Sequence, residues 1–406
     1  MQVRAITGFI DPGWPLKPER IQALSAALKA CRRALQASGY EVQTLRLATP
    51  APIEMTNPVP VAERPELARQ LEAECFVHGI DYAAIGPALP EELDAFDVIP
   101  DILGATQNVF TSGLYADQAD GLSLPAARAC AAAIQANATI EQNGFGNLRF
   151  AALVNVPAGV PFFPAAYHRG GPPAIAIATE AADLPVSALQ DAKSLRSARR
   201  SLIGAIETQA ATLAQNAERT AQEHNVRFLG VDFSFAPFPE SARSLGTALE
   251  ALGVPKVGWG GSAAAAAFLA DCLDRAEFPR VGFCGLFLPV FEDQVLAQRA
   301  ADGTLNLSDL LLYSTLCGTG LDTIPLPGDV SIDALTGVLI DLGAVGLRHA
   351  KPLTARLMPI PGKSAGEDVQ FDFAYFAPSR VMPLPDQGPL GLLAGAELFD
   401  INPHNI

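Results

Sequence analysis

Positive charge is scarce in this sequence. Its 406 residues include 28 Lys and Arg against 43 Asp and Glu, which gives a formal net charge of −15. The chain also has no run of basic residues. Nucleic-acid-binding surfaces need clustered positive charge. The composition therefore argues against a nucleic-acid partner.

Long apolar runs and paired cysteines are missing as well. The longest run of small apolar residues, 263–270, is far shorter than the ~20 residues that a membrane-spanning helix needs. The six cysteines include no CxxC pair, which argues against a structural zinc site. The opening MQVRAITGFIDPGWP carries Asp11 and two prolines where a signal peptide needs an apolar core. We therefore expect a cytoplasmic protein with reduced thiols and no membrane partner.

Three common catalytic motifs are absent. No HExxH occurs, so a zinc hydrolase is not indicated. The GKS at 362–364 lacks the first glycine of a phosphate-binding P-loop, because position 357 is Leu. No GxGxxG stands between a strand and a helix, so a nicotinamide cofactor has no support.

The chain does have an extensive apolar content, with 49% hydrophobic residues. Apolar periodicity and Gly or Pro breaks predict alternating strands and helices. The expected strands are 3–10, 40–47, 82–86, 150–155, 174–178, 226–235 and 282–288; the expected helices are 15–39, 65–78, 97–108, 122–137, 185–224, 241–252 and 263–275. This alternation favours an α/β fold. Because no polar linker interrupts it, we expect residues 1–406 to form a single compact domain.

Residues 282–329 are the most informative stretch. The expected strand 282–288 is followed by Glu292 and Asp293 at the start of a helix, where acids are favoured. A turn containing Cys317, Gly318 and Gly320 then ends a further helix. Backbone N–H groups in such a turn can hold an oxyanion or activate a thiolate, so Cys317 is a candidate nucleophile and the two glycines are candidate substrate-binding residues. The alternative is a cysteine that only fills space.

Five acids follow or flank apolar, strand-like segments: Asp232, Glu292, Asp293, Asp322 and Asp329. Carboxylates that converge at strand ends suit general acid/base chemistry or a divalent cation. We take Asp322 as a catalytic candidate and Asp232, Asp293 and Glu292 as tentative metal ligands. Helix capping is the alternative for each of them. The sequence does not identify a cofactor, and a divalent cation is one candidate.

His168 and Arg356 complete the candidate site. His168 lies in a stiff, aromatic-rich loop beside Tyr167 and can act as an acid or base, unless it is held structurally. Arg356 lies in an apolar segment and can clamp an anion, with Lys363 as a second cation. An internal salt bridge to Asp322 or Asp329 is the alternative for Arg356. We expect Cys317, Asp322, Asp293, Asp232 and His168 to line one pocket.

Long motifs carry a family resemblance. They are VRAITGFIDPGWP, ATQNVF, PFFPAAYH, GVDFSFAPFPESARSLGTALEALG, GLFLPVFED, SxxCGTGLDTIPLPGD and KPLTARLMPIPGKSAG. Together they resemble the family called domain of unknown function (DUF) 711. The resemblance implies a large mixed α/β barrel like that of pyruvate formate-lyase, with a loop through its centre. It implies no glycyl-radical chemistry, because the sequence Arg-Val-Met-Pro at 380–383 lacks the Gly and the aromatic residue of the glycyl-radical motif.

Two function classes remain. The first is an enzyme that acts on a small polar or anionic metabolite, with Cys317 as nucleophile and acids nearby. The alternative is a noncatalytic barrel that binds or senses a small anion. Reactive residue types on stiff loops favour the enzyme. A homo-oligomer stays open.

Overall fold

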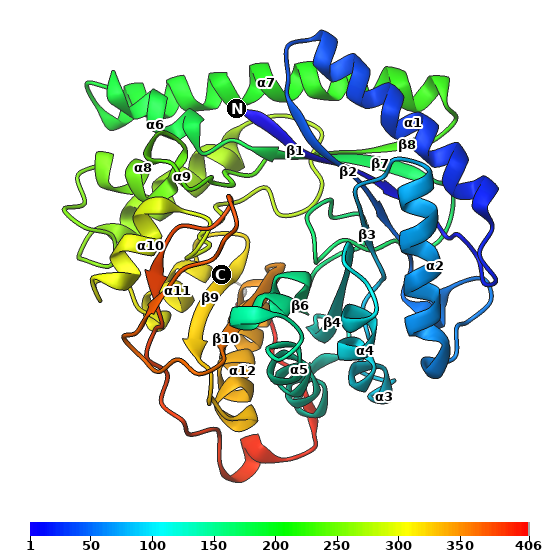
Figure 1. The fold of residues 1–406 in the computed structure, drawn as a ribbon. Coiled ribbons are helices and arrows are strands. Elements are labelled where there is room, and N and C mark those ends of the chain that lie inside the picture. The colour runs from blue at the N-terminus through cyan, green and yellow to red at the C-terminus, as the bar shows by residue number, and fades with distance from the viewer. Residues whose placement is uncertain (405–406) are drawn as a thin grey trace.

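One large sheet organises the molecule (Figure 1). The computed structural model describes residues 1–404. The strands are β1 (Gln2–Phe9), β2 (Val42–Ala48), β3 (Tyr82–Ala84), β4 (Val109–Asp117), β5 (Gly121–Ser123), β6 (Phe150–Val154), β7 (Ala174–Glu180), β8 (Arg227–Asp232), β9 (Gly320–Pro327), β10 (Leu353–Ile360), β11 (Asp368–Val369), β12 (Ser379–Arg380) and β13 (Leu398–Phe399).

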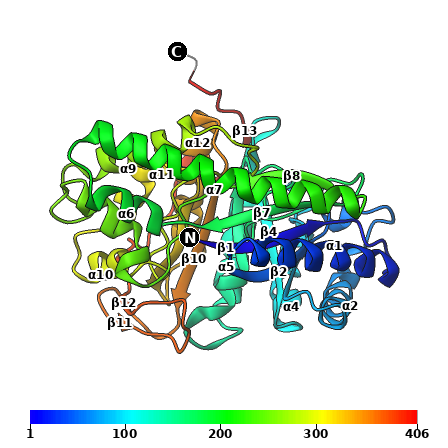
Figure 2. The same ribbon diagram turned by 90° about the horizontal axis from the view of Figure 1, so that it is seen from above.

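Helices connect most of these strands and lie outside the sheet (Figure 2). They are α1 (Pro18–Ala37), α2 (Arg64–Val77), α3 (Asp94–Asp97), α4 (Ile99–Gly104), α5 (Leu124–Asn137), α6 (Asp183–Gln190), α7 (Leu195–Glu223), α8 (Leu245–Ala251), α9 (Ser262–Arg275), α10 (Gln294–Ala301), α11 (Leu307–Ser314) and α12 (Ile332–His349). The mixed α/β class expected from the sequence is confirmed. No helix within residues 1–404 combines the length and apolarity that a bilayer crossing needs.

The main sheet contains a central group of five parallel strands and two outer pairs of parallel strands. Its order is β8-β7-β1-β2-β3-β4-β6-β10-β9. Strands β1, β2, β3, β4 and β6 run parallel to one another. The outer pairs β7–β8 and β10–β9 are parallel within each pair, and they join the central group through the antiparallel contacts β1–β7 and β6–β10.

Apolar periodicity explains why these segments form these elements. Helix α1 buries the face that the sequence predicted, through Ile21, Leu24, Leu28, Cys31 and Leu35. All seven residues of β7 are buried. A strand that is covered on both faces has this continuous apolar character rather than alternation.

Helix boundaries follow the capping groups. The single helix expected over 185–224 is two helices, because Ser194 forms a capping box with Ser197 and starts α7 afresh. Strand β4 has no counterpart in the prediction, and the helix expected over 97–108 is only the short α4.

The strand expected over 282–288 does not form. This segment makes only isolated bridges, from Arg280 to Val231 and from Leu286 to Phe235. The Asp232 carboxylate accepts hydrogen bonds from the N–H groups of Phe283 and Cys284, so these N–H groups are not free to pair with a neighbouring strand.

The same segment touches the other edge of the sheet too. Thr319, just before β9, donates its hydroxyl to the carbonyl of Leu286, and Val290 donates its N–H to the carbonyl of Asp322 in β9. The closed barrel that the resemblance implied is not present among the named strands of residues 1–404, since β8 and β9 end the sheet. The segment 280–291 lies between these two edges.

Candidate functional site

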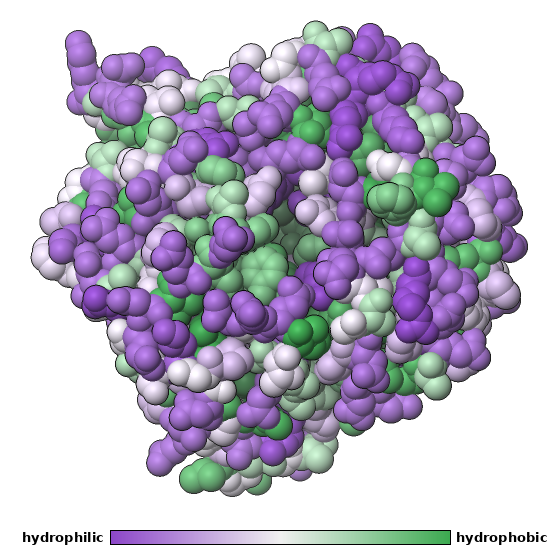
Figure 3. Space-filling view, in the orientation of Figure 1, coloured by the Kyte–Doolittle hydropathy of each residue, from purple (hydrophilic) through white to green (hydrophobic). Residues whose placement is uncertain are grey.

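A cavity opens on the face of the molecule that carries the middle of the sheet. The face is hollowed near its centre, with apolar residues inside the hollow and hydrophilic residues around it (Figure 3). The cavity has a volume of about 110 Å³. The lining comes from β1 to β4, β9 and β10 and from the loops between them: Arg4, Gln43, Thr44, Arg46, Tyr82, Phe110, Leu148, Phe162, Phe163, Ala236, Pro237, Phe287, Pro289, Glu292, Asp322, Arg356, Phe373 and Tyr375.

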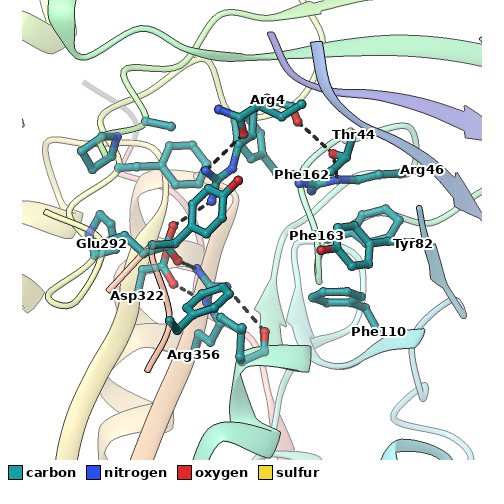
Figure 4. Close-up of a pocket in the computed structure, with 18 residues that line it drawn as sticks. Arg4, Thr44, Arg46, Tyr82, Phe110, Phe162, Phe163, Glu292, Asp322 and Arg356 are labelled. Carbon is teal, nitrogen blue, oxygen red and sulfur yellow. Dashed lines mark hydrogen bonds and ion pairs between the residues drawn. The ribbon is translucent and has the colours of Figure 1, made fainter. Parts of the chain in front are cut away.

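One wall of the cavity is a chain of buried ion pairs (Figure 4). Glu292 accepts a hydrogen bond from Arg356 Nη2 at 2.7 Å and another from Arg4 Nη2 at 3.0 Å. Arg356 Nε donates to Asp322 Oδ1 at 2.5 Å. Burial opposes the charge on Arg356, but the carboxylates of Asp322 and Glu292 outweigh it and raise the pKa of Arg356. The salt bridge to Asp322 that the sequence offered as an alternative is therefore present, together with a second one to Glu292.

Further charged and polar side chains bind Arg4 from behind the lining or share its partner Glu180. Glu180 at the end of β7 accepts from Arg4 Nη1 at 2.9 Å and from Arg243 Nη1 at 3.1 Å. Gln43 donates to the same carboxylate at 2.9 Å. Arg4 also stacks on the Tyr375 ring, with its guanidinium carbon 5.0 Å from the ring centroid. These contacts fix the position of Arg4, and through it the position of Glu292.

Arg46 lies across the cavity from this wall and has no carboxylate partner within residues 1–404 (Figure 4). It is 8% exposed. Its Nε donates to Thr44 Oγ1 at 2.9 Å, while its two Nη groups donate to no described residue. Its guanidinium stacks near the rings of Phe163 and Tyr82, at 5.0 and 5.9 Å from their centroids. Burial, with repulsion from Arg4, lowers the pKa of Arg46 to about 9.

Cys317 lies outside the cavity. The residue is 1% exposed. It follows the C-terminal end of α11, where its N–H donates to the carbonyl of Tyr313. Burial raises the pKa of its thiol despite hydrogen bonds from the N–H groups of Thr319 and Gly320. The turn thus aims N–H groups at the sulfur as expected, but desolvation is the larger effect. Gly318 instead packs closely on the segment before it, because a Cβ on Gly318 would lie 3.1 Å from the carbonyl oxygen of Phe283.

Asp232 and Asp293 are fully buried and satisfied by protein donors. Asp232 accepts from the N–H groups of Phe283 and Cys284 and from the Ser234 hydroxyl, and burial raises its pKa to about 6. Asp293 caps α10 and also accepts from Ser244 and two N–H groups at the start of α8. Both acids therefore bind backbone N–H groups. For Asp293 this is the helix-capping alternative, whereas the N–H groups that Asp232 binds lie outside any helix.

The five residues expected to line one pocket do not converge, since only Asp322 reaches the cavity. His168 is buried in its loop with Nε2 unpartnered among the described residues, and burial lowers its pKa. The Tyr167 hydroxyl donates to the carbonyl of Val156, and Lys363 borders a different surface depression. Residues 1–404 contain no group of three or more His, Cys, Asp or Glu side chains placed to hold a metal ion. Of the tentative metal ligands, Glu292 alone lines the cavity.

The sequence reasoning missed Arg4 and Arg46. Each is a charged residue inside an otherwise apolar strand, in VRAITGF and TLRLA. An arginine at a position that the pattern marks as buried needs a partner or a ligand. This signal was available for both residues, as it was for Arg356. Tyr375 gave no such signal, because it lies in the irregular, aromatic-rich segment between β11 and β12.

Comparison with known proteins places the chain in a family. A family model described as uncharacterised ACR (DUF711) matches residues 1–374. The chain belongs to the DUF711 family. The chain is 31% identical over 394 residues to a UPF0210 protein of Pyrobaculum islandicum, with 90% of this chain and 87% of the relative covered. It is 30% identical to the UPF0210 protein of Pyrobaculum arsenaticum with the same coverage, and 29% identical to that of Methanopyrus kandleri over 75% of this chain and 70% of the relative. The family likeness expected from the motifs is thus confirmed, and these names carry no activity.

Proposed function

We propose that the protein binds a small organic anion in the cavity between Arg46 and the Glu292–Arg356 wall. The observation that carries this proposal is the Arg46 guanidinium, which is buried, faces the cavity and has two Nη groups without a described acceptor. Neither Nη atom is sealed from solvent, but a guanidinium that is largely removed from water and has no counter-charge still costs free energy. An anionic ligand that accepts from both Nη groups offsets this cost, and the planar guanidinium suits a carboxylate or phosphate.

Catalysis on that anion is a second candidate. Its support is that groups able to give or accept a proton line the same cavity, namely the carboxylates of Glu292 and Asp322 and the hydroxyls of Tyr82 and Tyr375. A noncatalytic sensing role needs only Arg46. The Cys317 thiol is not part of either candidate, because it lies outside the cavity lining.

We further propose that the sheet and segment 280–291 together form a barrel of the pyruvate formate-lyase type. The strand directions support this. The five central strands run parallel to one another, and β7, β8, β9 and β10 run in the opposite direction. Segment 280–291 runs parallel to β8 where it bridges that strand. A comparison of an experimental structure with that of the lyase tests this proposal, and a β8–β9 gap filled only by solvent would contradict it.

The binding proposal is tested by substituting Arg46 with Gln. Because the native guanidinium lacks a counter-charge, Arg46→Gln should leave the ligand-free protein as stable as the wild type or more stable, while affinity for small anions falls at least about tenfold. Arg200→Gln is the matched control, since Arg200 is exposed on α7. Differential scanning fluorimetry with a panel of carboxylates and phosphates measures both quantities.

One measurement separates the two candidates, and a second tests the assignment of Arg46. Mass spectrometry of a metabolite extract incubated with the wild-type protein should show depletion of an anion if the protein is an enzyme, and no depletion if it only binds. An Arg46→Gln variant that binds anions as tightly as the wild type would refute the assignment of Arg46.

A further inference from the structure

The charges that line the cavity add up to a small positive excess. The lining contains three arginines, Arg4, Arg46 and Arg356, but only two carboxylates, Glu292 and Asp322. Behind the lining, Glu180 is matched by Arg243, which also contacts the exposed Glu240. Arg4 and Arg356 are both engaged with carboxylates, so the excess of one positive charge is located at Arg46.

Much of the remaining lining of the cavity is aromatic. Phe163 and Phe110 lie edge to face at 5.3 Å, and Tyr82 lies edge to face on Phe110 at 5.5 Å. Phe162 and Phe287 approach to 4.4 Å between ring centroids. Phe373 and Tyr375 line the cavity as well. Such walls favour a flat apolar body, since aromatic rings pack in offset or edge-to-face geometry.

We propose that the ligand is a monoanionic carboxylate attached to a flat apolar body, such as an aromatic ring. The inference rests on the proposed function and gives the substrate class of the same site. One carboxylate accepts from both Nη groups of Arg46 and cancels the positive excess. The apolar body lies among the aromatic side chains, where it replaces water.

The carboxylate is favoured over a phosphate by the charge of the opposite wall. A phosphate ester carries close to two negative charges at neutral pH. It would turn the excess of one positive charge into an excess of one negative charge, in a cavity that already contains Glu292 and Asp322. Like charges in a partly desolvated cavity repel, and this repulsion lowers the affinity for a dianion.

The test uses four probes of graded chemistry with the full-length protein. Isothermal titration should give benzoate the highest affinity, at least about tenfold above phenyl phosphate and above acetate. Benzyl alcohol, which keeps the ring and lacks the charge, should bind weakest or not at all. Phenyl phosphate binding as tightly as benzoate, or acetate binding as tightly, would overturn the inference about the ligand class.

The variants distinguish this failure from failure of the proposed function. If acetate, benzoate and phenyl phosphate all fail to bind, or bind equally to wild type and Arg46→Gln, the anion site itself is refuted. If they bind through Arg46 but without preference for benzoate, only the ligand class is refuted. Phe162→Leu should weaken benzoate about tenfold and leave acetate unchanged. Equal losses for both probes would contradict an aromatic body among these rings.

Discussion

Glu292 provides the most direct test of the ion-pair wall. It lies between the buried Arg356, at 2.7 Å, and the partly buried Arg4, at 3.0 Å. Glu292→Gln removes the negative charge and keeps nearly the same shape. Both arginines then face an amide, whose NH₂ group cannot accept from them.

The size of the effect follows from what remains. Removing one partner of a buried ion pair costs 3–5 kcal/mol of stability, because it leaves a charge buried without compensation. Here each arginine retains a carboxylate, since Arg4 keeps Glu180 and Arg356 keeps Asp322. We therefore expect a loss at the lower end, about 3 kcal/mol.

Urea-induced unfolding measures this loss of stability. The urea concentration at the midpoint of unfolding should fall, while the dependence of the unfolding free energy on urea concentration stays unchanged. Glu240→Gln is the matched control, because Glu240 is an exposed glutamate that contacts Arg243, and it should change stability by less than about 0.5 kcal/mol. A double-mutant cycle with Arg356→Gln should give a coupling energy of about 2 kcal/mol. A Glu292→Gln loss no larger than the control, or a coupling near zero, would refute the ion-pair wall as a structural unit.

Three further predictions follow from buried groups. In native protein, iodoacetamide should label Cys317 no faster than the other five cysteines, all of which are buried; selective labelling of Cys317 would contradict this. Arg356→Lys should lower stability by about 2 kcal/mol, since an ammonium cannot reproduce the geometry in which Nε and Nη2 bind Asp322 and Glu292; an unchanged melting temperature would argue against it. The folded-state pKa of Asp232, raised to about 6, means that its contribution to stability is fully present below about pH 4 and is lost as the pH rises through 6. The free energy of unfolding of the wild type, relative to that of Asp232→Asn, should thus fall by about 3 kcal/mol between pH 4 and 7. If the difference between the two unfolding free energies does not change with pH, the raised pKa is refuted.

The sequence predicted the elements whose signals are local. Helix α1 has its expected apolar face, and Asp293 lies at the start of a helix, as its position after the segment 282–288 suggested. The strand expected over 282–288 failed for a tertiary reason. The Asp232 carboxylate, about fifty residues earlier, binds the N–H groups of that segment and holds Cys284 at a φ of 45°. No pattern within the segment contains that information.

The candidate site was predictable only in part, and for the same reason. Asp322, Arg356 and Glu292 were found because they stand in or beside apolar segments within one stretch of chain. Their convergence with Arg4 joins residues separated by 288 positions. Asp232, Asp293 and Cys317 carry equally suggestive local patterns, but each is occupied by backbone groups. Local pattern identifies residues that need a partner; it does not say whether the partner is the backbone, another side chain or a ligand.

That distinction can be made for arginine within this molecule. Four arginines in residues 1–404 are buried: Arg46, Arg64, Arg149 and Arg356. Arg64 binds Glu92, Arg149 binds Glu141 and several carbonyls, and Arg356 binds two carboxylates. Only Arg46 lacks an acid, and it is also the one whose free donors face a cavity. Because the fold supplies a counter-charge to every other buried guanidinium in this set, the missing counter-charge at Arg46 supports our proposal that an anionic ligand binds there.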